Sequence, residues 1–231
     1  MNVAFSKLTS MNSSDAPQTK DIGLAGRAQA DPVLASLIDK RPDYDPDAWL
    51  RELPVMDLFG CLVFQIIGQQ LSVTATRAIL GRLTSKFDGH MPSAEGVAEL
   101  DEQALRDTGL SWRKAKTVLD LAARFADGRL SAEHLSTLPD DRVVDELTQI
   151  PGVGPWTAHG ALLISLRRAD VVPVGDIMLR NTMKTYYGFD HVPTEDEVTD
   201  IAAAWRPHRS LGVNLLFAAA EFDSASAPSS R

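Results

Sequence analysis

The chain has 231 residues, of which 44% are hydrophobic and 23% are charged, and its formal net charge is −8. This composition is that of an ordinary folded globular protein with enough apolar residues for a sizeable core. The single cysteine, Cys61, excludes an internal disulfide, a cysteine-ligated zinc site and a four-cysteine iron–sulfur cluster. The acidic balance argues mildly against a nucleic-acid partner, because proteins that bind polyanions tend to be basic.

No segment of the sequence is expected to enter or cross a membrane. The longest apolar runs, around residues 58–67 and 158–166, are shorter than the roughly 20 residues that a membrane-spanning helix needs. Residues 1–20 are polar and carry no secretory signal pattern. We therefore expect a cytoplasmic protein.

The first predicted elements are helices. Residues 1–30 lack sustained periodicity and are predicted to form a flexible tail, whereas Asp31 and Pro32 make a helix-start signal. An almost continuous apolar run over residues 56–68 predicts a helix that is buried on most sides. The next helix is predicted to begin after Ser72. Its core-facing stripe is predicted to be Val73, Thr76, Leu80, Leu83 and Phe87.

The rest of the chain also has helical patterns. Short helices are predicted from Ser93 and Asp101, and Ser111 is predicted to cap a longer one. The inward residues of that longer helix are predicted to be Trp112, Ala115, Leu119, Ala122 and Phe125. Further helices are predicted over residues 139–148, 156–168, 176–187, 194–205 and 210–222. The one strand-like stretch, residues 171–174, is short and contains a proline, so the predicted fold class is all-α.

The sequence Ile150-Pro-Gly-Val-Gly-Pro155 lies between two of these predicted helices. Its two glycines permit positive φ and leave backbone amides uncovered directly before a helix N-terminus. Such a turn can bind one phosphate through its N–H donors and the positive end of the helix, and its carbonyls can converge on a monovalent cation. Taken alone, the same pattern also fits a tight turn that uses glycine only for its geometry.

The hairpin is followed by a second motif, Val172-Pro-Val-Gly-Asp176, whose aspartate lies 22 residues after Gly154. Together with residues 66–72, 155–158 and 205–210, these motifs resemble the helix-hairpin-helix superfamily of DNA glycosylases. Within that superfamily the sequence is most similar to the alkylbase enzymes of the DNA-3-methyladenine glycosylase II type. The resemblance spans residues 54–222.

The resemblance implies two helical subdomains with a DNA-binding cleft between them. We predict that residues 31–60 and 167–224 form one subdomain, that residues 61–166 form a central bundle ending in the hairpin, and that residues 225–231 form a tail. The chain is shorter than members with an extra N-terminal α/β domain. It also lacks the four cysteines of the members that hold an iron–sulfur cluster.

Position 156 separates two reaction types within the superfamily. Relatives that also cleave the DNA strand carry a nucleophilic lysine two residues after the second glycine of the hairpin, where this chain has Trp156. Without an amine no Schiff base with the sugar can form. The resemblance therefore implies a monofunctional glycosylase that leaves an intact abasic site.

The resemblance assigns catalysis to Asp176. Cleavage of an N-glycosidic bond builds positive charge on the sugar, which a carboxylate can stabilise while it orients or deprotonates a water. A Gly-Asp pair before a helix is also an ordinary N-cap, and the two roles are compatible. Trp156 and Phe217 are the candidates for stacking on a cationic base, although the family has a tryptophan at the position of Phe217. Tyr186 and Tyr187 are expected in the core or on the surface.

The other predicted site residues contact DNA or an ion. Gln70, followed by Leu71, is expected to be the wedge that fills the gap left by a flipped base, unless Gln69 and Gln70 only cap a helix end. The DNA backbone is expected to meet Gly152, Gly154, Trp156, Arg113, Lys114 and Lys116, of which the last three also fit a solvated helix face. A monovalent cation, Na+ or K+, is expected on the backbone carbonyls of Thr148, Ile150 and Val153.

The implied function is excision of alkylated purines such as 3-methyladenine and 7-methylguanine from double-stranded DNA, by a monomeric enzyme that starts base excision repair. No required cofactor, iron–sulfur cluster or side-chain metal centre is expected. In a prokaryote such a protein would associate with the nucleoid. Two alternatives stay open: the same fold removing deaminated or oxidised bases, and a non-catalytic helix-hairpin-helix protein that only binds DNA.

Overall fold

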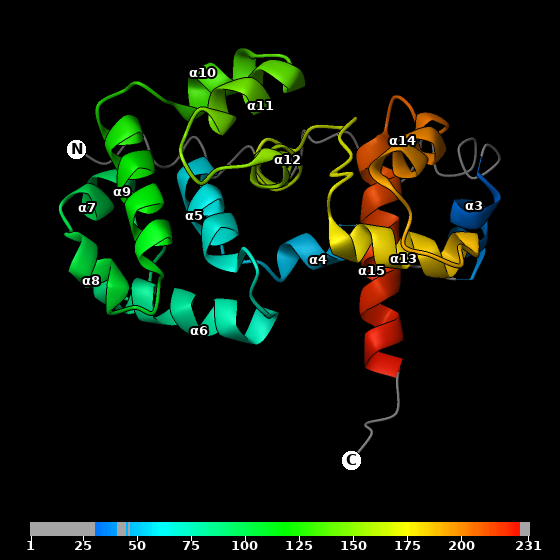
Figure 1. Cartoon of the computed structure of the whole chain (residues 1–231), viewed down its shortest axis with the longest axis horizontal. Coiled ribbons are helices and arrows are strands. Elements are labelled where there is room, and N and C mark those ends of the chain that lie inside the picture. The colour runs from blue at the N-terminus through cyan, green and yellow to red at the C-terminus, as the bar shows by residue number, and fades with distance from the viewer. Residues whose placement is uncertain (1–30, 41–44, 46, 227–231) are drawn as a thin grey trace. The chain divides into compact units, whose positions relative to one another are not determined.

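The computed structural model of the chain describes residues 31–40, 45 and 47–226 (Figure 1). It divides into two units, residues 1–45 and residues 46–231. In the first unit, α3 (Pro32–Asp39) begins as predicted, because the Asp31 carboxylate accepts the backbone N–H groups of Val33 and Leu34. The predicted tails at residues 1–30 and 227–231 lie outside the described residues, whereas residues 225 and 226 belong to the last helix.

The second unit is helical throughout its described part, with no strand, in agreement with the predicted all-α class. Its elements are α4 (Ala48–Arg51), α5 (Leu58–Gly68), α6 (Val73–Thr84), a 3-10 turn η2 (Ser85–Phe87), α7 (Ala94–Ala98), α8 (Glu102–Arg106), α9 (Trp112–Ala126), α10 (Ala132–Thr137), α11 (Asp140–Thr148), α12 (Pro155–Ile164), α13 (Ile177–Tyr187), α14 (Glu195–Ala203) and α15 (Arg209–Ser226). Among the described residues, none of these helices has both the length and the apolar character that a membrane crossing requires.

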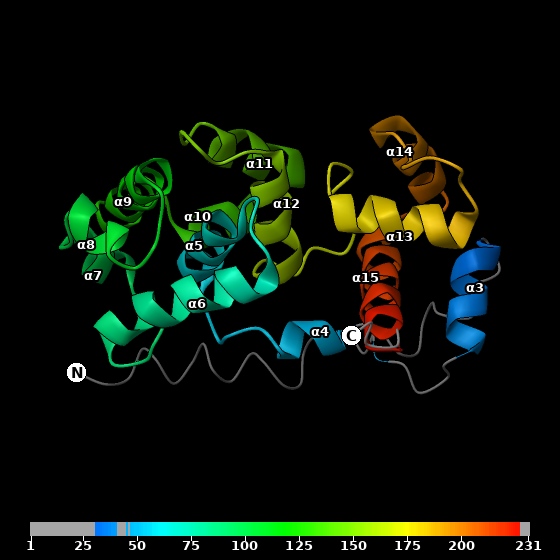
Figure 2. The same ribbon diagram turned by 60° about the horizontal axis from the view of Figure 1, so that its bottom comes forward.

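Helix α5 forms the centre of the first group of helices. It contacts α6, α9 and α12, and Figures 1 and 2 show it between α9 and α12. Nearly all of its side chains are buried, which explains why its apolar residues do not follow the one-sided pattern of a surface helix. Asp57 caps its N-terminus by accepting the Gly60 N–H at 2.8 Å.

A second group is built on α15. Helices α13 and α14 both contact α15, and the two figures show α13 crossing it (Figure 2). The connector from α12 to α13 is fixed to its surroundings by charged side chains. The guanidinium of Arg168 donates to the carbonyls of Ser136 and Leu138, and Asp170 accepts from Nε of Arg209 at 2.7 Å. These contacts fix the position at which α13 begins.

Several predicted details of the helices differ from the structure. Val73 is 67% exposed rather than inward, and Ile79 is buried in the α6 stripe beside Thr76, Leu80 and Leu83. Trp112 is 51% exposed at the start of α9, whose buried face is formed by Ala115, Thr117, Val118, Leu121 and Ala122. Both errors fall on the first residue of a helix, where neighbouring helices decide which side is covered.

One helix boundary and one short helix also differ from the prediction. Helix α12 ends at Ile164 rather than near residue 168, and Arg167 just beyond it has a φ of 52°, a left-handed conformation that stops a helix. Helix α10 was absent from the prediction, although Ser131 caps it by accepting the His134 N–H at 3.1 Å. The division into subdomains at residues 60/61 and 166/167 stays a prediction.

Candidate functional site

The Gly/Pro hairpin forms a tight turn between α11 and α12. The N–H of Val153 donates to the carbonyl of Ile150 at 3.0 Å, and Gly152 has a φ of 94°, which an L side chain rarely adopts. The surroundings also leave no room for a side chain at position 152, because a Cβ there would lie 3.1 Å from Cγ2 of Thr117. The Thr117 hydroxyl in turn donates to the carbonyl of Pro151 at 2.9 Å, so α9 holds the hairpin in place.

Helix α12 starts from this hairpin without a side-chain cap. Its N-cap is Gly154, and among the described residues no side chain caps the first backbone N–H groups of the helix. Such N–H groups have no partner inside the helix, and they carry the positive end of its dipole. The geometry leaves a set of donors at the start of α12 that can bind an anion.

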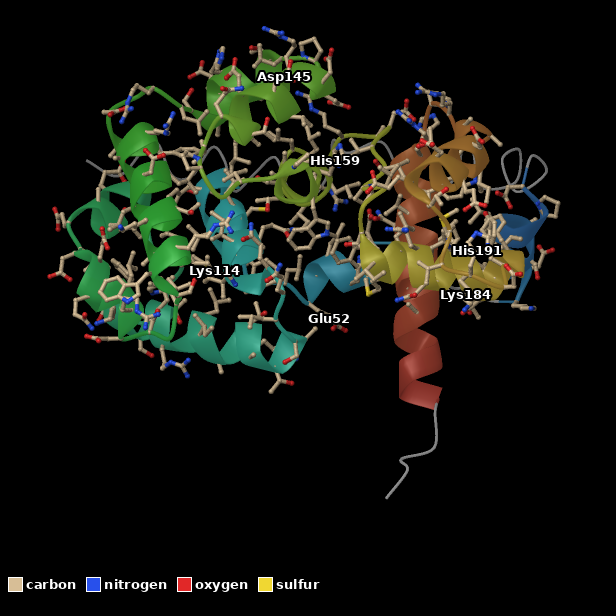
Figure 3. All side chains as sticks on the ribbon, in the orientation of Figure 1. Glu52, Lys114, Asp145, His159, Lys184 and His191 are labelled. Atoms are coloured by element: carbon tan, nitrogen blue, oxygen red, sulfur yellow. The ribbon has the colours of Figure 1, made fainter. Side chains whose placement is uncertain are left out.

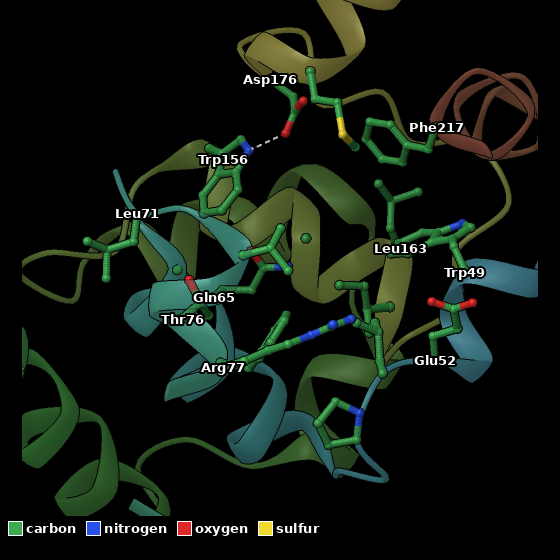
Figure 4. A pocket seen from close by; sticks show the side chains of 18 of the residues that line it. Trp49, Glu52, Gln65, Leu71, Thr76, Arg77, Trp156, Leu163, Asp176 and Phe217 are labelled. Atoms are coloured by element: carbon green, nitrogen blue, oxygen red, sulfur yellow. Dashed lines mark hydrogen bonds between the residues drawn. The ribbon is translucent and has the colours of Figure 1, made fainter. Parts of the chain in front are cut away.

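Asp176 and Trp156 lie together, although 20 residues separate them in sequence. The indole Nε1 of Trp156 donates to Oδ2 of Asp176 at 2.6 Å (Figure 4). The other carboxylate oxygen, Oδ1, accepts the backbone N–H of Leu179 at 2.9 Å and caps α13. Asp176 is therefore a helix cap and a site residue at once, with each oxygen in one role.

A pocket of about 550 Å³ opens beside this pair. Its walls come from α4, α5, α6, α12, α13 and α15, all within the second unit. The lining is predominantly apolar, with Asp176 on one wall and Phe217 on another (Figure 4). Glu52 and Arg77 supply charge elsewhere in the lining. A mostly apolar pocket with a few placed polar groups is typical of a small-molecule or base-binding site.

Exposed apolar side chains gather at the pocket and beside it. Leu71, Val73, Trp156 and Met178 line the pocket and are nevertheless accessible, and Ile177 next to Asp176 is 60% exposed. Large apolar residues that stay exposed together mark an interaction surface more often than a packing defect. Most of the large apolar residues that are exposed in the described part of the chain therefore lie at or beside the pocket that holds Asp176, whereas Val55 and Trp112 are exposed but do not line it.

The aromatic residues predicted for a base pocket occupy different environments. Trp156 is 36% exposed at the pocket, whereas Phe217 is only 7% exposed and packs edge-on against Trp49, with ring centroids 5.6 Å apart. Both residues line the pocket, so the structure brings them to one cavity. Tyr186 and Tyr187 are half-buried near the end of α13 and do not line it.

The loop between α5 and α6 carries the predicted wedge residues. Gln70 is exposed with a φ of 56°, a left-handed conformation, and Leu71 is exposed next to it at the pocket. Gln69 anchors the loop: its Nε2 donates to the carbonyl of Gly152 and to the Thr157 hydroxyl, both at 3.0 Å. One side chain therefore connects the wedge loop to the hairpin and to α12.

The three cations predicted on α9 are not equivalent. Arg113 and Lys116 are exposed, as expected for residues that meet solvent or DNA. Lys114 instead directs its Nζ to the carbonyls of Ile67 and Gln69, at 2.8 and 2.7 Å (Figure 3). Partial burial lowers the pKa of this ammonium. Its contacts satisfy the C-terminal carbonyls of α5, so Lys114 stabilises the wedge loop.

The described residues contain no cluster of three or more His, Cys, Asp or Glu side chains that could hold a metal ion. The carbonyls proposed for a monovalent cation, at Thr148, Ile150 and Val153, belong to one turn, and hard oxygen ligands of this kind suit Na+ or K+. The carbonyl of Ile150 also accepts the N–H of Val153, and the cation stays a prediction. Cys61 is fully buried, and burial raises the pKa of its thiol to about 12, so it is not a nucleophile.

Three residues of the site were missed by the sequence analysis: Gln65, Gln69 and Trp49. Gln65 is the one amide side chain in the apolar run of α5, and that contrast was a signal that it faces something other than the core. Gln69 belongs to the motif at residues 66–72, but its sequence position indicates only a helix cap and not the contacts with Gly152 and Thr157. Nothing in the local sequence marks Trp49 as a partner of Phe217, because 168 residues separate them.

The chain is similar to known proteins over most of its length. It is 33% identical to the Bacillus subtilis (strain 168) protein YfjP over 159 residues, covering 66% of this chain and 55% of that protein. It is 28% identical to a DNA-3-methyladenine glycosylase of the same strain over 193 residues, covering 79% of this chain and 62% of that protein. The chain thus spans less than two thirds of the length of these two curated relatives.

Solved structures share the fold. The Schizosaccharomyces pombe 3-methyladenine DNA glycosylase Mag1 in complex with abasic DNA has a TM-score of 0.74 at 26% identity, covering 82% of this chain and 91% of that one. A Clostridium acetobutylicum 8-oxoguanine glycosylase/lyase bound to DNA has a TM-score of 0.70 at 20% identity, covering 87% of this chain and 70% of that one, which shows the fold alone.

The hairpin, the aspartate that follows it and the pocket between them lie within or beside the segment that matches a family model. That model, the HhH-GPD superfamily base excision DNA repair protein, matches residues 63–207, which is more than half of the chain. Both the fold and the sequence motifs agree with the match. The chain belongs to the HhH-GPD superfamily of base excision DNA repair proteins.

Proposed function

We propose that this protein is a DNA glycosylase that takes an alkylated purine, of the 3-methyladenine or 7-methylguanine type, out of double-stranded DNA and hydrolyses its N-glycosidic bond. The observation that carries this proposal is the carboxylate of Asp176 on the wall of an apolar pocket, held by the Trp156 indole. A group that only capped α13 would need neither the pocket nor the indole. Similarity to 3-methyladenine glycosylases supports the choice of alkylated purines.

The reaction begins with a good leaving group. A purine methylated at N3 or N7 is cationic, so it leaves as a neutral base when the C1′–N9 bond breaks and N9 keeps the electron pair. The sugar then carries positive charge, which the nearby carboxylate of Asp176 stabilises. Water attacks C1′ and loses a proton, for which Asp176 is the acceptor. The products are the free base and an intact abasic site.

The pocket favours a cationic base through its aromatic rings. The Trp156 ring lies at the pocket beside Asp176, and Phe217 with Trp49 forms an aromatic pair on another wall. A positive base placed against an electron-rich ring is attracted by its quadrupole, which a neutral base is not. This preference separates alkylated purines from undamaged ones without any general acid.

In this proposal, the hairpin and α9 bind the phosphate backbone of the DNA. We assign the uncapped N–H groups around Gly152, Gly154 and Trp156 to a phosphate near the flipped nucleotide. Arg113 and Lys116 are exposed and are assigned to backbone phosphates, where each contact should add about one to the salt-dependence slope. The proposed Na+ or K+ on the hairpin carbonyls would neutralise part of the same phosphate.

The α5–α6 loop supplies the wedge. Gln70 is exposed on a loop that Gln69 and Lys114 hold in place, and Leu71 beside it is an exposed apolar residue at the pocket. A base that leaves the helix exposes its neighbours and its orphaned partner. The Gln70 amide can hydrogen-bond that partner while Leu71 packs against the stack.

The substrate test is a release panel on defined DNA. Wild-type protein is expected to release 3-methyladenine and 7-methylguanine from methylated duplex DNA, measured by chromatography of the free bases. Release of only uracil, hypoxanthine or 8-oxoguanine from matched oligonucleotides would overturn the alkylpurine assignment in favour of a deaminated or oxidised base. Binding of damaged DNA with no base released in any arm would favour a non-catalytic DNA-binding protein.

A further inference from the structure

The side chain of Gln65 is buried and has no hydrogen-bond partner among the described residues. It lies on α5, is 7% exposed and lines the pocket, into which its amide points below Trp156 (Figure 4). The amide makes no hydrogen bond to another described residue, so in the free protein its donors and acceptor can be satisfied only by solvent that enters the pocket. Within a binding pocket, the missing partner is most simply supplied by the ligand.

Gly160 makes the room for this amide. It lies one helical turn after Trp156 on the same face of α12, and it also lines the pocket. A Cβ on Gly160 would lie 2.6 Å from Cδ of Gln65, so the Gln65 amide would have to move from its position in the pocket. Glycine is among the least favourable residues in a helix interior, and here the nearest atoms that a side chain would meet are those of the Gln65 amide.

We propose that the Gln65 amide reads the hydrogen-bonding edge of the extruded base, an inference that rests on the proposed glycosylase function. A primary amide presents an acceptor oxygen beside two donor hydrogens. The edge of adenine that normally pairs in the duplex offers a donor beside an acceptor, and guanine offers the reverse order. Rotation of the amide by half a turn matches either order, so one side chain serves both 3-methyladenine and 7-methylguanine.

This role adds selectivity that stacking does not provide. The aromatic rings of the pocket detect charge and shape, whereas Gln65 detects an adjacent donor and acceptor. A site built to hydrogen-bond a polar edge rejects a ligand that lacks it, because the amide is then left buried and unpaired. Gln65 is therefore a specificity-determining residue, distinct from Asp176, which acts on the sugar.

The test uses three variants of the full chain. Gln65→Met keeps the volume and removes the hydrogen bonds, and Gln103→Met on the exposed face of α8 is the matched control. Gly160→Ala keeps Gln65 but displaces its amide. Each protein is assayed for single-turnover release of 3-methyladenine and 7-methylguanine, and for binding to duplex DNA with a tetrahydrofuran abasic analogue, which has no base to read.

Gln65→Met and Gly160→Ala should each lower both release rates by roughly 10- to 100-fold, while their affinity for the abasic duplex stays within about twofold of wild type. Gln103→Met should match wild type in both assays. Unchanged release by Gln65→Met, or an equal loss of abasic-DNA affinity, would overturn the assignment of Gln65. Absence of methylated-base release by the wild-type protein would instead refute the proposed function, and with it this inference.

Discussion

The indole N–H of Trp156 donates to the carboxylate of Asp176 over 2.6 Å, and this bond joins the first turn of α12 to the start of α13. By the resemblance described above, position 156 is the one at which strand-cleaving members of the superfamily carry a nucleophilic lysine. In this chain the residue that replaces the lysine therefore contacts the proposed catalytic group.

Replacing Trp156 by Phe should lower the rate of base release by roughly 10-fold, because it keeps a ring at the pocket but removes the donor that orients Asp176. Single-turnover release of 7-methylguanine measures the change. Trp112→Phe, at an exposed tryptophan outside the pocket, is the control and should retain the wild-type rate. An unchanged rate for Trp156→Phe would show that the hydrogen bond does not position the carboxylate.

Asp176→Asn should lower base release by roughly 100- to 1,000-fold, because the amide cannot carry the negative charge that stabilises the sugar cation. Stability should change little, since asparagine caps helices as well as aspartate does and the Leu179 N–H keeps an acceptor. The matched control is Asp101→Asn, which alters a similar cap on α8 outside the pocket. Thermal unfolding and release assays on both variants separate the two roles of Asp176.

The product of the reaction should be an abasic site in an unbroken strand. Trp156 offers no amine, so borohydride should trap no covalent protein–DNA adduct, and strand breaks should appear only after treatment with hot alkali. Denaturing gels of a labelled duplex with a single damaged base record both outcomes. A trapped adduct with the wild-type protein would show that some other amine of the chain acts as a lyase nucleophile.

Lys114→Met should lower the free energy of unfolding by about 1–3 kcal/mol, because the carbonyls of Ile67 and Gln69 lose a charged donor. The methionine keeps most of the volume of the lysine stem. Lys116→Met, on the exposed side of the same helix, should leave the unfolding free energy unchanged. Denaturant titration gives the free energy of unfolding of both variants. Equal values for the two would show that Lys114 does not anchor the loop.

A surface cluster predicts how stability depends on pH. Hydrogen bonds to Asp190 and then Glu197 raise the pKa of His191 (Figure 3). Because the folded pKa lies above the unfolded value of about 6.5, the stabilising contribution is complete below that pH and is lost as pH rises through the folded pKa.

His191→Gln should therefore lower the melting temperature at pH 5.5 and leave it unchanged at pH 9. The control is His90→Gln, at an exposed histidine that forms no ion pair among the described residues, which should have the same small effect at both pH values. A destabilisation by His191→Gln that does not vary with pH would indicate a packing role instead.

Local sequence patterns determined the helical character of this protein and most of its helix starts. Ser72, Ser111 and Thr194 each cap the helix that follows them, because a short polar side chain can satisfy an N–H a few residues ahead. The hairpin and Asp176 were equally visible, since both belong to short motifs with fixed spacing.

Which residues contact these motifs was determined by the tertiary structure alone. The Trp156–Asp176 bond joins residues 20 positions apart, and Gln65 lies against Gly160, 95 positions away. Lys114 contacts carbonyls 47 and 45 positions before it. Sequence periodicity cannot predict contacts at such separations. The exposure of Val73 and Trp112 likewise depended on which neighbouring helices cover the start of each helix. Helix formation follows from hydrogen bonds and side chains within a few residues, whereas a pocket depends on the packing of distant segments.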